Sequence, residues 1–311
     1  MAKLDIVALG EPMYEFSQIP GQRRQYLQGY GGDTMNCAIA AARQGAKVAY
    51  ITRLGDDEFG REFLDLWQRE HIDSSGVGID ADAHTAVYFI RHGPDGHMFS
   101  YLRNGSAASR MKPDHLVSNL IQSAQFFHTS GITQAISASA CETVFAAIEI
   151  ARSSGVMVTF DANIRPRLWP AERARDIIGN TIPLTDYFLL SLEDAELLDA
   201  PKDRVDIIRW AHDLEARHVV LKLGPEGILA SVHGTTHVVP GHRVQSVDAT
   251  GAGDCCAGAM LARLSLGDDF FSALQYCNAA AALTTMDYGA VAPLPTREAV
   301  LEFLGAASPS K

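Results

Sequence analysis

The sequence predicts an α/β fold in which helices cover both faces of a mainly parallel sheet, with a small antiparallel sheet attached. Short apolar, β-branched runs alternate with longer helical stretches along the chain. Such runs are typical of parallel strands that are buried on both faces. No internal repeat, low-complexity tract or long linker divides the 311 residues. We therefore expect a single domain over residues 1–311.

The predicted elements follow one another through the whole chain. Strands are expected at Leu4–Leu9, Val48–Leu54, Phe126–Thr129, Val156–Asp161, Tyr187–Leu190 and Val219–Leu223. Helices are expected at Thr34–Gln44, Ala138–Ser153, Arg204–Ala216, Gly253–Leu264 and Phe270–Thr285. Ligands of such sheets bind beyond the carboxyl ends of the strands, so the polar residues that follow these strands are candidate site residues.

Two segments, at about 14–29 and 85–103, interrupt this alternation and predict the small antiparallel sheet. The second contains two strands joined by Gly93-Pro94-Asp95-Gly96, a strong turn signal. The sheet is either an edge feature without a role or a lid that excludes water from a reacting centre. Its alternating apolar residues also predict a homo-oligomer that forms through the lid.

Charge and composition exclude several classes of partner. The formal net charge is −11 and no Lys/Arg-rich stretch is present, which argues against nucleic acid or an anionic membrane. No apolar run approaches the length of roughly 18 residues that spans a bilayer, and the chain begins directly with a strand, so we expect a cytoplasmic protein. Five cysteines without a CxxC pair predict buried, reduced thiols.

The stretch Asp248-Ala249-Thr250-Gly251-Ala252-Gly253-Asp254 predicts a phosphate site. It has the pattern of a glycine turn that leads into a helix. Gly251 and Gly253 permit close backbone approach, and the amides at a helix start attract an anion. Asp254 would repel a phosphate, but it is suited to take the proton of a hydroxyl that attacks one. The alternative is that Asp254 only caps the helix.

This stretch resembles the C-terminal signature of the ribokinase-like (PfkB) carbohydrate kinases, and Gly31-Gly32-Asp33-Thr34-Met35-Asn36 resembles their N-terminal signature. The resemblance implies a ribokinase-like three-layer sandwich that uses ATP and Mg²⁺. It also implies that Asp254 is the catalytic base and that Gly251, Ala252 and Gly253 form the anion hole. By the same resemblance, the segment from Lys222 through Gly224 to Gly227 lines the nucleotide site, and Asn278 either reaches the adenine or lies on a solvated face.

The N-terminal signature has a physical reading of its own. The turn at Gly31 and Gly32 permits close approach to a polyhydroxy ligand, and the side chains of Asp33 and Asn36 bind hydroxyl groups. Capping of the helix by Asp33 or Thr34 is compatible with that role.

Two arginines and two tyrosines indicate an acidic acceptor. Arg165 follows a predicted strand, and Arg103 lies two residues after Tyr101, on the same face of the second lid strand, while Tyr88 lies on the first. Paired guanidinium groups suit a carboxylate, whereas a neutral sugar does not need them. The alternative is that Arg103 is a solvated edge charge and Arg165 a surface ion-pair partner.

The pattern resembles the members of the family that phosphorylate the terminal hydroxyl of 2-keto-3-deoxygluconate. Their substrate contacts correspond to Gly32, Tyr88, Tyr101, Arg103 and Arg165, and Asn163 and Arg165 border the nucleotide. Ser191 and Asp194 stand where many members have Asn and Glu near magnesium, so Asp194 is the candidate metal contact, through water. Cys255-Cys256 departs from the usual pair after the base, and we expect packing residues there.

Three other functions remain open at this stage. The acceptor is alternatively a neutral sugar such as fructose or ribose, or a nucleoside. A sugar-acid sensor would keep the fold without needing a base at Asp254. A dinucleotide oxidoreductase is disfavoured because Gly10-Glu11-Pro12, and not G-x-G-x-x-G, follows the first strand.

Overall fold

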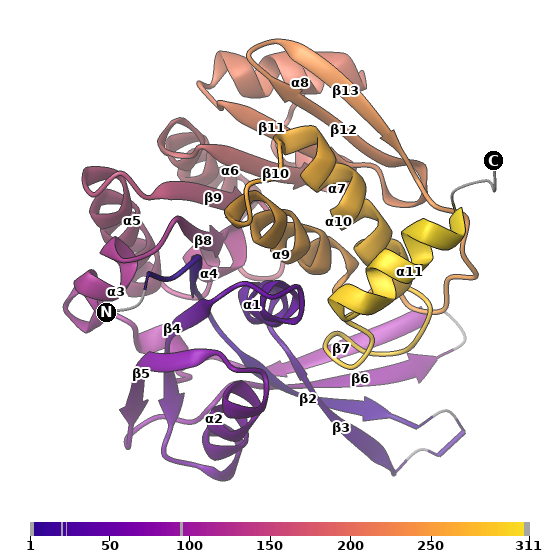
Figure 1. Cartoon of the computed structure of the whole chain (residues 1–311). Coiled ribbons are helices and arrows are strands. Elements are labelled where there is room, and N and C mark those ends of the chain that lie inside the picture. Colours follow the sequence, from indigo (N-terminus) through magenta and orange to yellow (C-terminus); the bar gives the residue numbers. More distant parts are fainter. Residues whose placement is uncertain (1–2, 20, 23, 94–95, 308–311) are drawn as a thin grey trace.

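The computed structural model describes residues 3–19, 21–22, 24–93 and 96–307, which form two sheets with helices around the larger one (Figure 1). The large sheet has the strand order β13-β12-β11-β10-β9-β8-β1-β4-β5. Its strands are β1 (Ile6–Leu9), β4 (Val48–Gly55), β5 (Asp73–Asp80), β8 (Phe126–Ser130), β9 (Met157–Asp161), β10 (Tyr187–Ser191), β11 (His218–Lys222), β12 (Gly227–Val232) and β13 (Thr235–Pro240). The pairs from β5 to β11 are parallel, and β12 and β13 continue the sheet antiparallel.

Successive residues of the central strands enter different hydrophobic cores. On β1, Ile6 and Ala8 belong to the core on one face of the sheet, and Val7 and Leu9 belong to the core on the other. All four side chains are fully buried. This alternation follows from the period of two in a strand, and it confirms the predicted parallel sheet that is covered on both faces.

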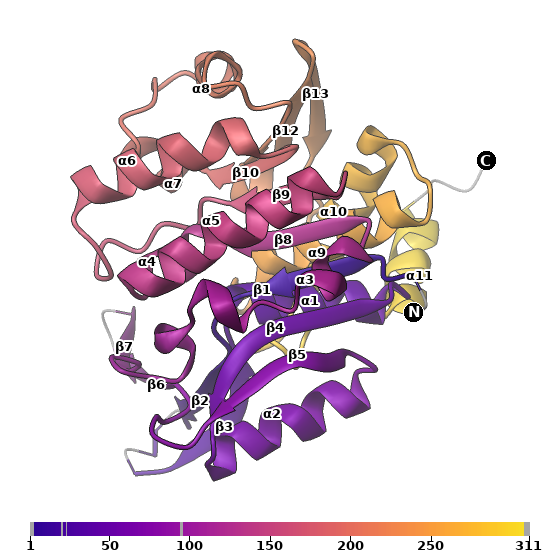
Figure 2. The same ribbon diagram turned by 90° about the vertical axis from the view of Figure 1, so that its left-hand side faces the viewer.

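Two helical layers cover these faces (Figures 1 and 2). One layer consists of α1 (Asp33–Arg43), α2 (Glu58–Arg69), α9 (Ala252–Ser265), α10 (Phe270–Thr284) and α11 (Arg297–Ala307). The other consists of α3 (Ser118–Gln122), α4 (Gly131–Ala135), α5 (Ala138–Ser153), α6 (Ala171–Thr181), α7 (Leu192–Leu197) and α8 (Arg204–Asp213). Single 3-10 turns occur at Ala108–Arg110, Pro113–His115, Ile182–Leu184 and Gly224–Glu226.

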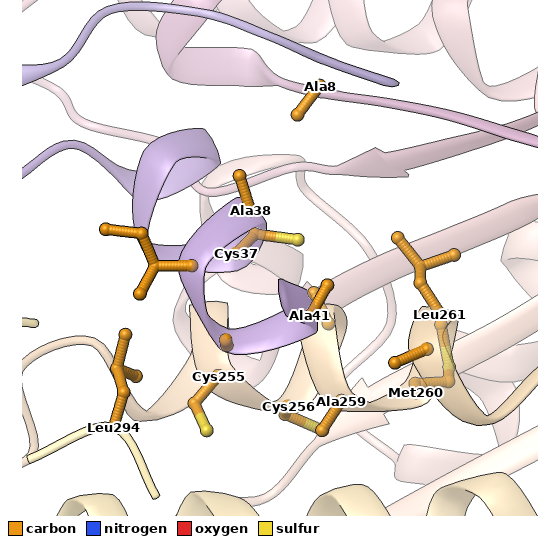
Figure 3. Packing of buried hydrophobic residues seen from close by; sticks show 14 of the residues in the cluster. Ala8, Cys37, Ala38, Ala41, Cys255, Cys256, Ala259, Met260, Leu261 and Leu294 are labelled. Carbon is orange, nitrogen blue, oxygen red and sulfur yellow. The ribbon is translucent and has the colours of Figure 1, made fainter. Parts of the chain in front are cut away.

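In the first layer α1 and α9 are in close contact because both present small residues (Figure 3). A Cβ on Gly258 of α9 would collide with the carbonyl oxygen of Cys37 on α1. Cys255 and Cys256 are buried beside this contact, which confirms that they are packing residues.

The small sheet consists of two antiparallel hairpins in the order β3-β2-β6-β7. Its strands are β2 (Met13–Gln18), β3 (Tyr26–Gly31), β6 (Val87–Gly93) and β7 (Gly96–Leu102). β6 and β7 lie within the predicted segment 85–103, whereas β2 and β3 extend one and two residues beyond the predicted segment 14–29. The hairpins join through β2 and β6, which are parallel. Pro94 and Asp95 of the predicted turn lie outside the described residues.

Some elements were not predicted. β5 carries polar residues and two glycines, Gly76 and Gly78, so its sequence lacks the apolar run of a buried strand. A Cβ on Gly76 would lie 2.8 Å from the carbonyl oxygen of Tyr50, which explains why glycine occupies this edge strand. The other elements that were not predicted are β13, α2, α3, α4, α6, α7 and α11. No helix within the described ranges has the length and apolar character needed to cross a membrane.

Candidate active site

A cavity of about 880 Å³ lies beyond the carboxyl ends of β1, β8, β9 and β11 and reaches the small sheet. It therefore lies where ligands of parallel sheets bind. Many of the predicted site residues line it, although they come from distant parts of the chain: Gly32, Asp33, Asn36, Tyr88, Tyr101, Arg103, Asn163, Arg165, Lys222, Gly251, Gly253 and Asp254.

Asp254 lies in the first turn of α9 and faces α1 across the cavity floor. Its Oδ2 accepts a hydrogen bond of 2.8 Å from Nδ2 of Asn36, which is buried. Burial raises the pKa of Asp254 to about 7, the nearby Asp33 carboxylate adds to the shift, and the Asn36 hydrogen bond opposes it. A carboxyl group with a pKa near the working pH is suited to act as a general base.

The glycine turn before Asp254 has the form expected of an anion hole. Gly251 caps α9 with a φ of 78°, in the left-handed region that favours glycine. A Cβ there would lie 2.8 Å from the carbonyl oxygen of Ala290, so a side chain would also crowd the turn. The amides at the start of α9 have no intrahelical acceptor and carry the positive end of the helix dipole, and that of Ala252 donates to the carbonyl oxygen of Ala249 at 3.2 Å.

Lys222 supplies a cation beside this turn. A Cβ on Gly253 would lie 3.3 Å from its Nζ, and Nζ donates a hydrogen bond of 2.6 Å to Oδ2 of the buried Asp161. Burial works against the charged ammonium, but the attraction of Asp161 outweighs it and raises the pKa of Lys222. Lys222 is therefore held as a cation beside the glycine turn, which locally offsets the acidic character of the chain.

A second carboxylate, Asp33, lies at the start of α1. Its Oδ2 accepts a hydrogen bond of 2.9 Å from Nδ2 of Asn163, the second residue after β9. Asn163 has a φ of 35°, a left-handed conformation that asparagine tolerates better than most residues. The bond links the end of β9 to the start of α1 and fixes both side chains at the cavity.

Aromatic residues of the small sheet form one wall. Tyr88 and Tyr101 are directly opposite each other on β6 and β7, with ring centroids 6.1 Å apart, and Phe99 stacks on Tyr101 at 6.2 Å. The hydroxyl of Tyr88 donates a hydrogen bond to the buried Glu15. A Cβ on Gly31 would collide with that hydroxyl, so Gly31 shapes the wall without lining the cavity.

Arg103 is mostly buried and is paired with a carboxylate, so the alternative that it is a solvated edge charge is wrong. Its Nε and Nη2 donate hydrogen bonds of 2.9 and 2.5 Å to Oε2 of Glu11, whose side chain is fully buried. Arg165 is exposed at the other side of the cavity, where it donates to the carbonyl oxygen of Ile164 at 3.0 Å. The two guanidinium groups therefore differ, because only Arg103 is neutralised by a carboxylate.

Other predicted residues do not line the cavity: Ala252, Ser191, Asp194, Gly224, Gly227 and Asn278. Gly227 has a φ of 102° at the start of β12, and a Cβ there would collide with the carbonyl oxygen of Val239. Asn278 is buried and donates to the carbonyl oxygen of Pro240 at 2.8 Å, so it does not lie on a solvated face. Contact of these residues with a nucleotide stays a prediction.

Ser191 and Asp194 form a capping box at the start of α7. Oδ2 of Asp194 accepts from the amide and hydroxyl of Ser191, and Oδ1 accepts from the amide of Ile164 at 2.7 Å. In the described part of the chain, no group of three His, Cys, Asp or Glu side chains is arranged to hold a metal ion. The residues present therefore do not provide a protein cage for magnesium, and its contact with Asp194 stays a prediction.

Several lining residues were not predicted from the sequence, among them Glu11, Met13 and Arg167, and neither was Asp161, which pairs with Lys222. Glu11 lies just beyond the carboxyl end of β1, and this position after a predicted strand was the one sequence feature that could have identified it as a site residue. Arg167 is exposed and donates to the carbonyl oxygen of Phe99 at 3.4 Å, across the cavity mouth. Sequence spacing does not reveal such a contact between distant segments.

The fold, the glycine-lined helix start and the carboxylate beside it define an α/β phosphotransferase that acts on a hydroxyl group. The model of the pfkB family of carbohydrate kinases matches residues 3–297, and the chain belongs to this family. It is 36% identical to the 2-dehydro-3-deoxygluconokinase of Thermoproteus tenax, over 98% of this chain and 95% of that protein. It is 33% identical to fructokinase-1 of Zea mays, over 96% of this chain and 97% of that protein.

Solved structures show the same fold. The fructokinase of Xylella fastidiosa with bound ATP has a TM-score of 0.87 and 26% identity, over 97% of this chain and 98% of that chain. A putative ribokinase II of E. coli in complex with ATP and Mg²⁺ has a TM-score of 0.90 at 24% identity, over 97% of this chain and 99% of that chain. The predicted ribokinase-like fold and kinase family are confirmed.

Proposed function

We propose that this chain transfers the γ-phosphoryl group of ATP to the terminal hydroxyl of 2-keto-3-deoxygluconate, giving 2-keto-3-deoxy-6-phosphogluconate. The observation that carries the proposal is the position of Asp254, whose pKa is raised to about 7 beside the glycine turn at the start of α9. A binding protein would gain nothing from a buried carboxyl group that repels a phosphate at this point.

Each residue of the floor has a role in this reaction. Asp254 accepts the proton of the acceptor hydroxyl, and Asn36 orients the carboxylate through its hydrogen bond. The amides from Gly251 to Gly253 and the ammonium of Lys222 stabilise negative charge on the transferred group. Asp33 and Asn163 bind hydroxyl groups of the acceptor. ATP supplies the phosphoryl group.

An acidic acceptor is supported by the cationic groups around the cavity and by the relative from Thermoproteus tenax, which is named for this substrate. Arg165 is exposed to the cavity and has no carboxylate partner among the described residues, so it is the stronger candidate for the sugar carboxylate. Tyr88 and Tyr101 also line the cavity, from β6 and β7 of the small sheet, and are candidate substrate contacts.

A neutral sugar such as fructose is the second candidate, and one observation favours it. The ion pair between Glu11 and Arg103 removes the net charge of one of the two arginines on which the preference for an acid depends. The similarity to the fructokinase of Zea mays is nearly as high as that to the sugar-acid kinase.

A coupled ADP-release assay separates these candidates. The purified chain, with ATP and MgCl₂, is tested with 2-keto-3-deoxygluconate, gluconate, fructose, ribose and adenosine at equal concentrations. The proposal predicts the highest kcat/KM for 2-keto-3-deoxygluconate. A higher kcat/KM for fructose would indicate that the chain is a fructokinase. If no acceptor led to release of ADP, the alternative of a sugar-binding protein without kinase activity would be favoured.

A further inference from the structure

Glu11 and Arg103 form a buried ion pair in the cavity wall. The carboxylate of Glu11 is closed to solvent, and each of its oxygens has a partner: Oε1 accepts from the hydroxyl of Ser106 at 2.6 Å, and Oε2 accepts from Nε and Nη2 of Arg103. Glu11 lies just after β1 of the large sheet, whereas Arg103 and Ser106 follow β7 of the small sheet. The pair therefore joins the two sheets beside the acceptor space.

The hydrogen bonds occupy one edge of the guanidinium group. The Nη1 N–H groups and the second N–H of Nη2 bond to no described residue, and Arg103 lines the cavity. Arginine carries five N–H donors in a planar fork, so the free edge can bind a ligand oxygen while the Glu11 edge stays occupied. Arg103 is thus oriented before any ligand binds.

The net charge of the pair is zero. A ligand carboxylate at the free edge is attracted by Arg103 but repelled by Glu11, which lies only one guanidinium group further away. Because the Coulomb energy falls inversely with distance, this repulsion cancels roughly half of the attraction. A hydroxyl or carbonyl oxygen is hardly affected by this cancellation, because its hydrogen bond depends on donor geometry more than on net charge.

From this geometry, we propose that Glu11 is a specificity-determining residue. By neutralising Arg103, it makes this arginine an oriented hydrogen-bond donor to an oxygen of the acceptor and leaves the discrimination between acidic and neutral acceptors to Arg165. The inference rests on the proposed function only in taking the cavity as the acceptor site.

The first test compares the binding of gluconate and glucitol, which differ only by a carboxylate in place of a hydroxymethyl group. Glu11→Gln keeps the shape of the side chain, removes its charge and retains one acceptor oxygen for Arg103, while its amide NH2 can donate to the hydroxyl of Ser106. Calorimetric titration should show that E11Q gains about tenfold in affinity for gluconate relative to glucitol, compared with the wild type. An unchanged or smaller ratio would overturn the proposal.

A second test asks whether removal of the Glu11 charge restores the gluconate binding that is lost when Arg103 is replaced. Arg103→Gln leaves the charge of Glu11 unpaired in the wall, so gluconate binding should fall by about tenfold or more. The double variant E11Q/R103Q has a neutral pair again and should recover gluconate binding to within about threefold of the wild type. If the double variant stays as weak as R103Q, the charge of Arg103 itself holds the carboxylate and the proposal is wrong.

Glu70→Gln is the matched control. Glu70 also receives two hydrogen bonds from an arginine, Arg43, in a half-buried pair that does not line the cavity. E70Q should leave the gluconate-to-glucitol ratio unchanged. Thermal melts identify any variant that does not fold. If R103Q does not fold, the comparison of E11Q and of the double variant with the wild type still tests the proposal. Failure of the wild type to phosphorylate 2-keto-3-deoxygluconate would refute the proposed function without altering these binding ratios.

Discussion

Asn36 on α1 donates a hydrogen bond of 2.8 Å to Asp254 on α9, across 218 positions of the sequence. The contact depends on the close approach of the two helices (Figure 3). Gly258 permits this approach, because a Cβ there would collide with the carbonyl oxygen of Cys37. The proposed base is therefore oriented by a helix packed against its own.

Asp254→Asn should lower kcat by at least about 10³-fold, because the amide does not accept the proton of the acceptor hydroxyl. Binding of ATP should stay within a few fold of the wild type in a calorimetric titration. Asp268→Asn, which removes an ion pair with Arg263 at the far end of the same helix, is the control and should leave kcat unchanged. Near-normal turnover of D254N would contradict the role of the base.

The pH profile should report the pKa of Asp254. Because the base acts when it is deprotonated, kcat/KM should rise with pH through about 7. The Asn36 hydrogen bond opposes the rise in this pKa, so Asn36→Ala should move the acidic limb to higher pH. A profile that is flat from pH 5.5 to 8.5 would show that another group removes the proton.

Stability should depend on pH through the same group. The pKa of Asp254 is higher in the folded protein than its ordinary value of 3.8, so the folded state holds the proton more tightly. This contribution is fully present below about pH 4 and is lost as the pH rises through 7. Asp254→Asn should therefore raise the melting temperature at pH 8, by a free energy on the order of 4 kcal/mol, and should have much less effect at pH 4. An equal effect at both pH values would contradict the raised pKa.

Gly258→Ala should push α1 and α9 apart. The added Cβ would meet the Cβ of Ala40 at 2.9 Å and the amide nitrogen of Ala41 at 3.0 Å, as well as the Cys37 carbonyl. Overpacking of this kind costs about 1–3 kcal/mol in the free energy of unfolding. A lengthened Asn36 bond should also shift the acidic limb of kcat/KM upward. Gly179→Ala on α6, where the added Cβ would have no neighbour within 4 Å, is the control and should cause neither change.

Lys222→Met should abolish most of the turnover and destabilise the protein. Removal of the ammonium leaves Asp161 as an unpaired buried charge, which costs about 3–5 kcal/mol in the free energy of unfolding. The double variant D161N/K222M should recover much of that stability in urea unfolding, but not kcat, because the cation beside Gly253 is still missing. Recovery of kcat by the double variant would show that Lys222 serves only to neutralise Asp161.

Much of the large sheet could be predicted because its strands are apolar on both faces. The run that became β10 is apolar up to its last residue, and those that became β8 and β9 begin apolar and carry their polar residues mainly toward the carboxyl end. Burial on both sides leaves few other uses for such runs. β5 was missed because it is an edge strand with exposed polar residues and glycines, a composition that the sequence shares with loops.

The small sheet shows the limit of local patterns. Its two hairpins were recognisable from alternation and turn residues, but their junction through the parallel pair of β2 and β6 depends on where each strand leaves the large sheet. That path is a property of the whole topology. The lid role and the oligomeric assembly of this sheet stay predictions.

The sequence by itself determined the class of fold and the family, because buried strands, glycine turns and the residues that follow them are local features of the chain. Only the tertiary structure decided the charge states and partners of the site residues. Arg103 is paired with Glu11, and Lys222 is paired with Asp161. Burial beside α1 raises the pKa of Asp254 to about 7. Electrostatic interactions depend on distance in space and on exclusion of water, and neither can be read from separation along the sequence.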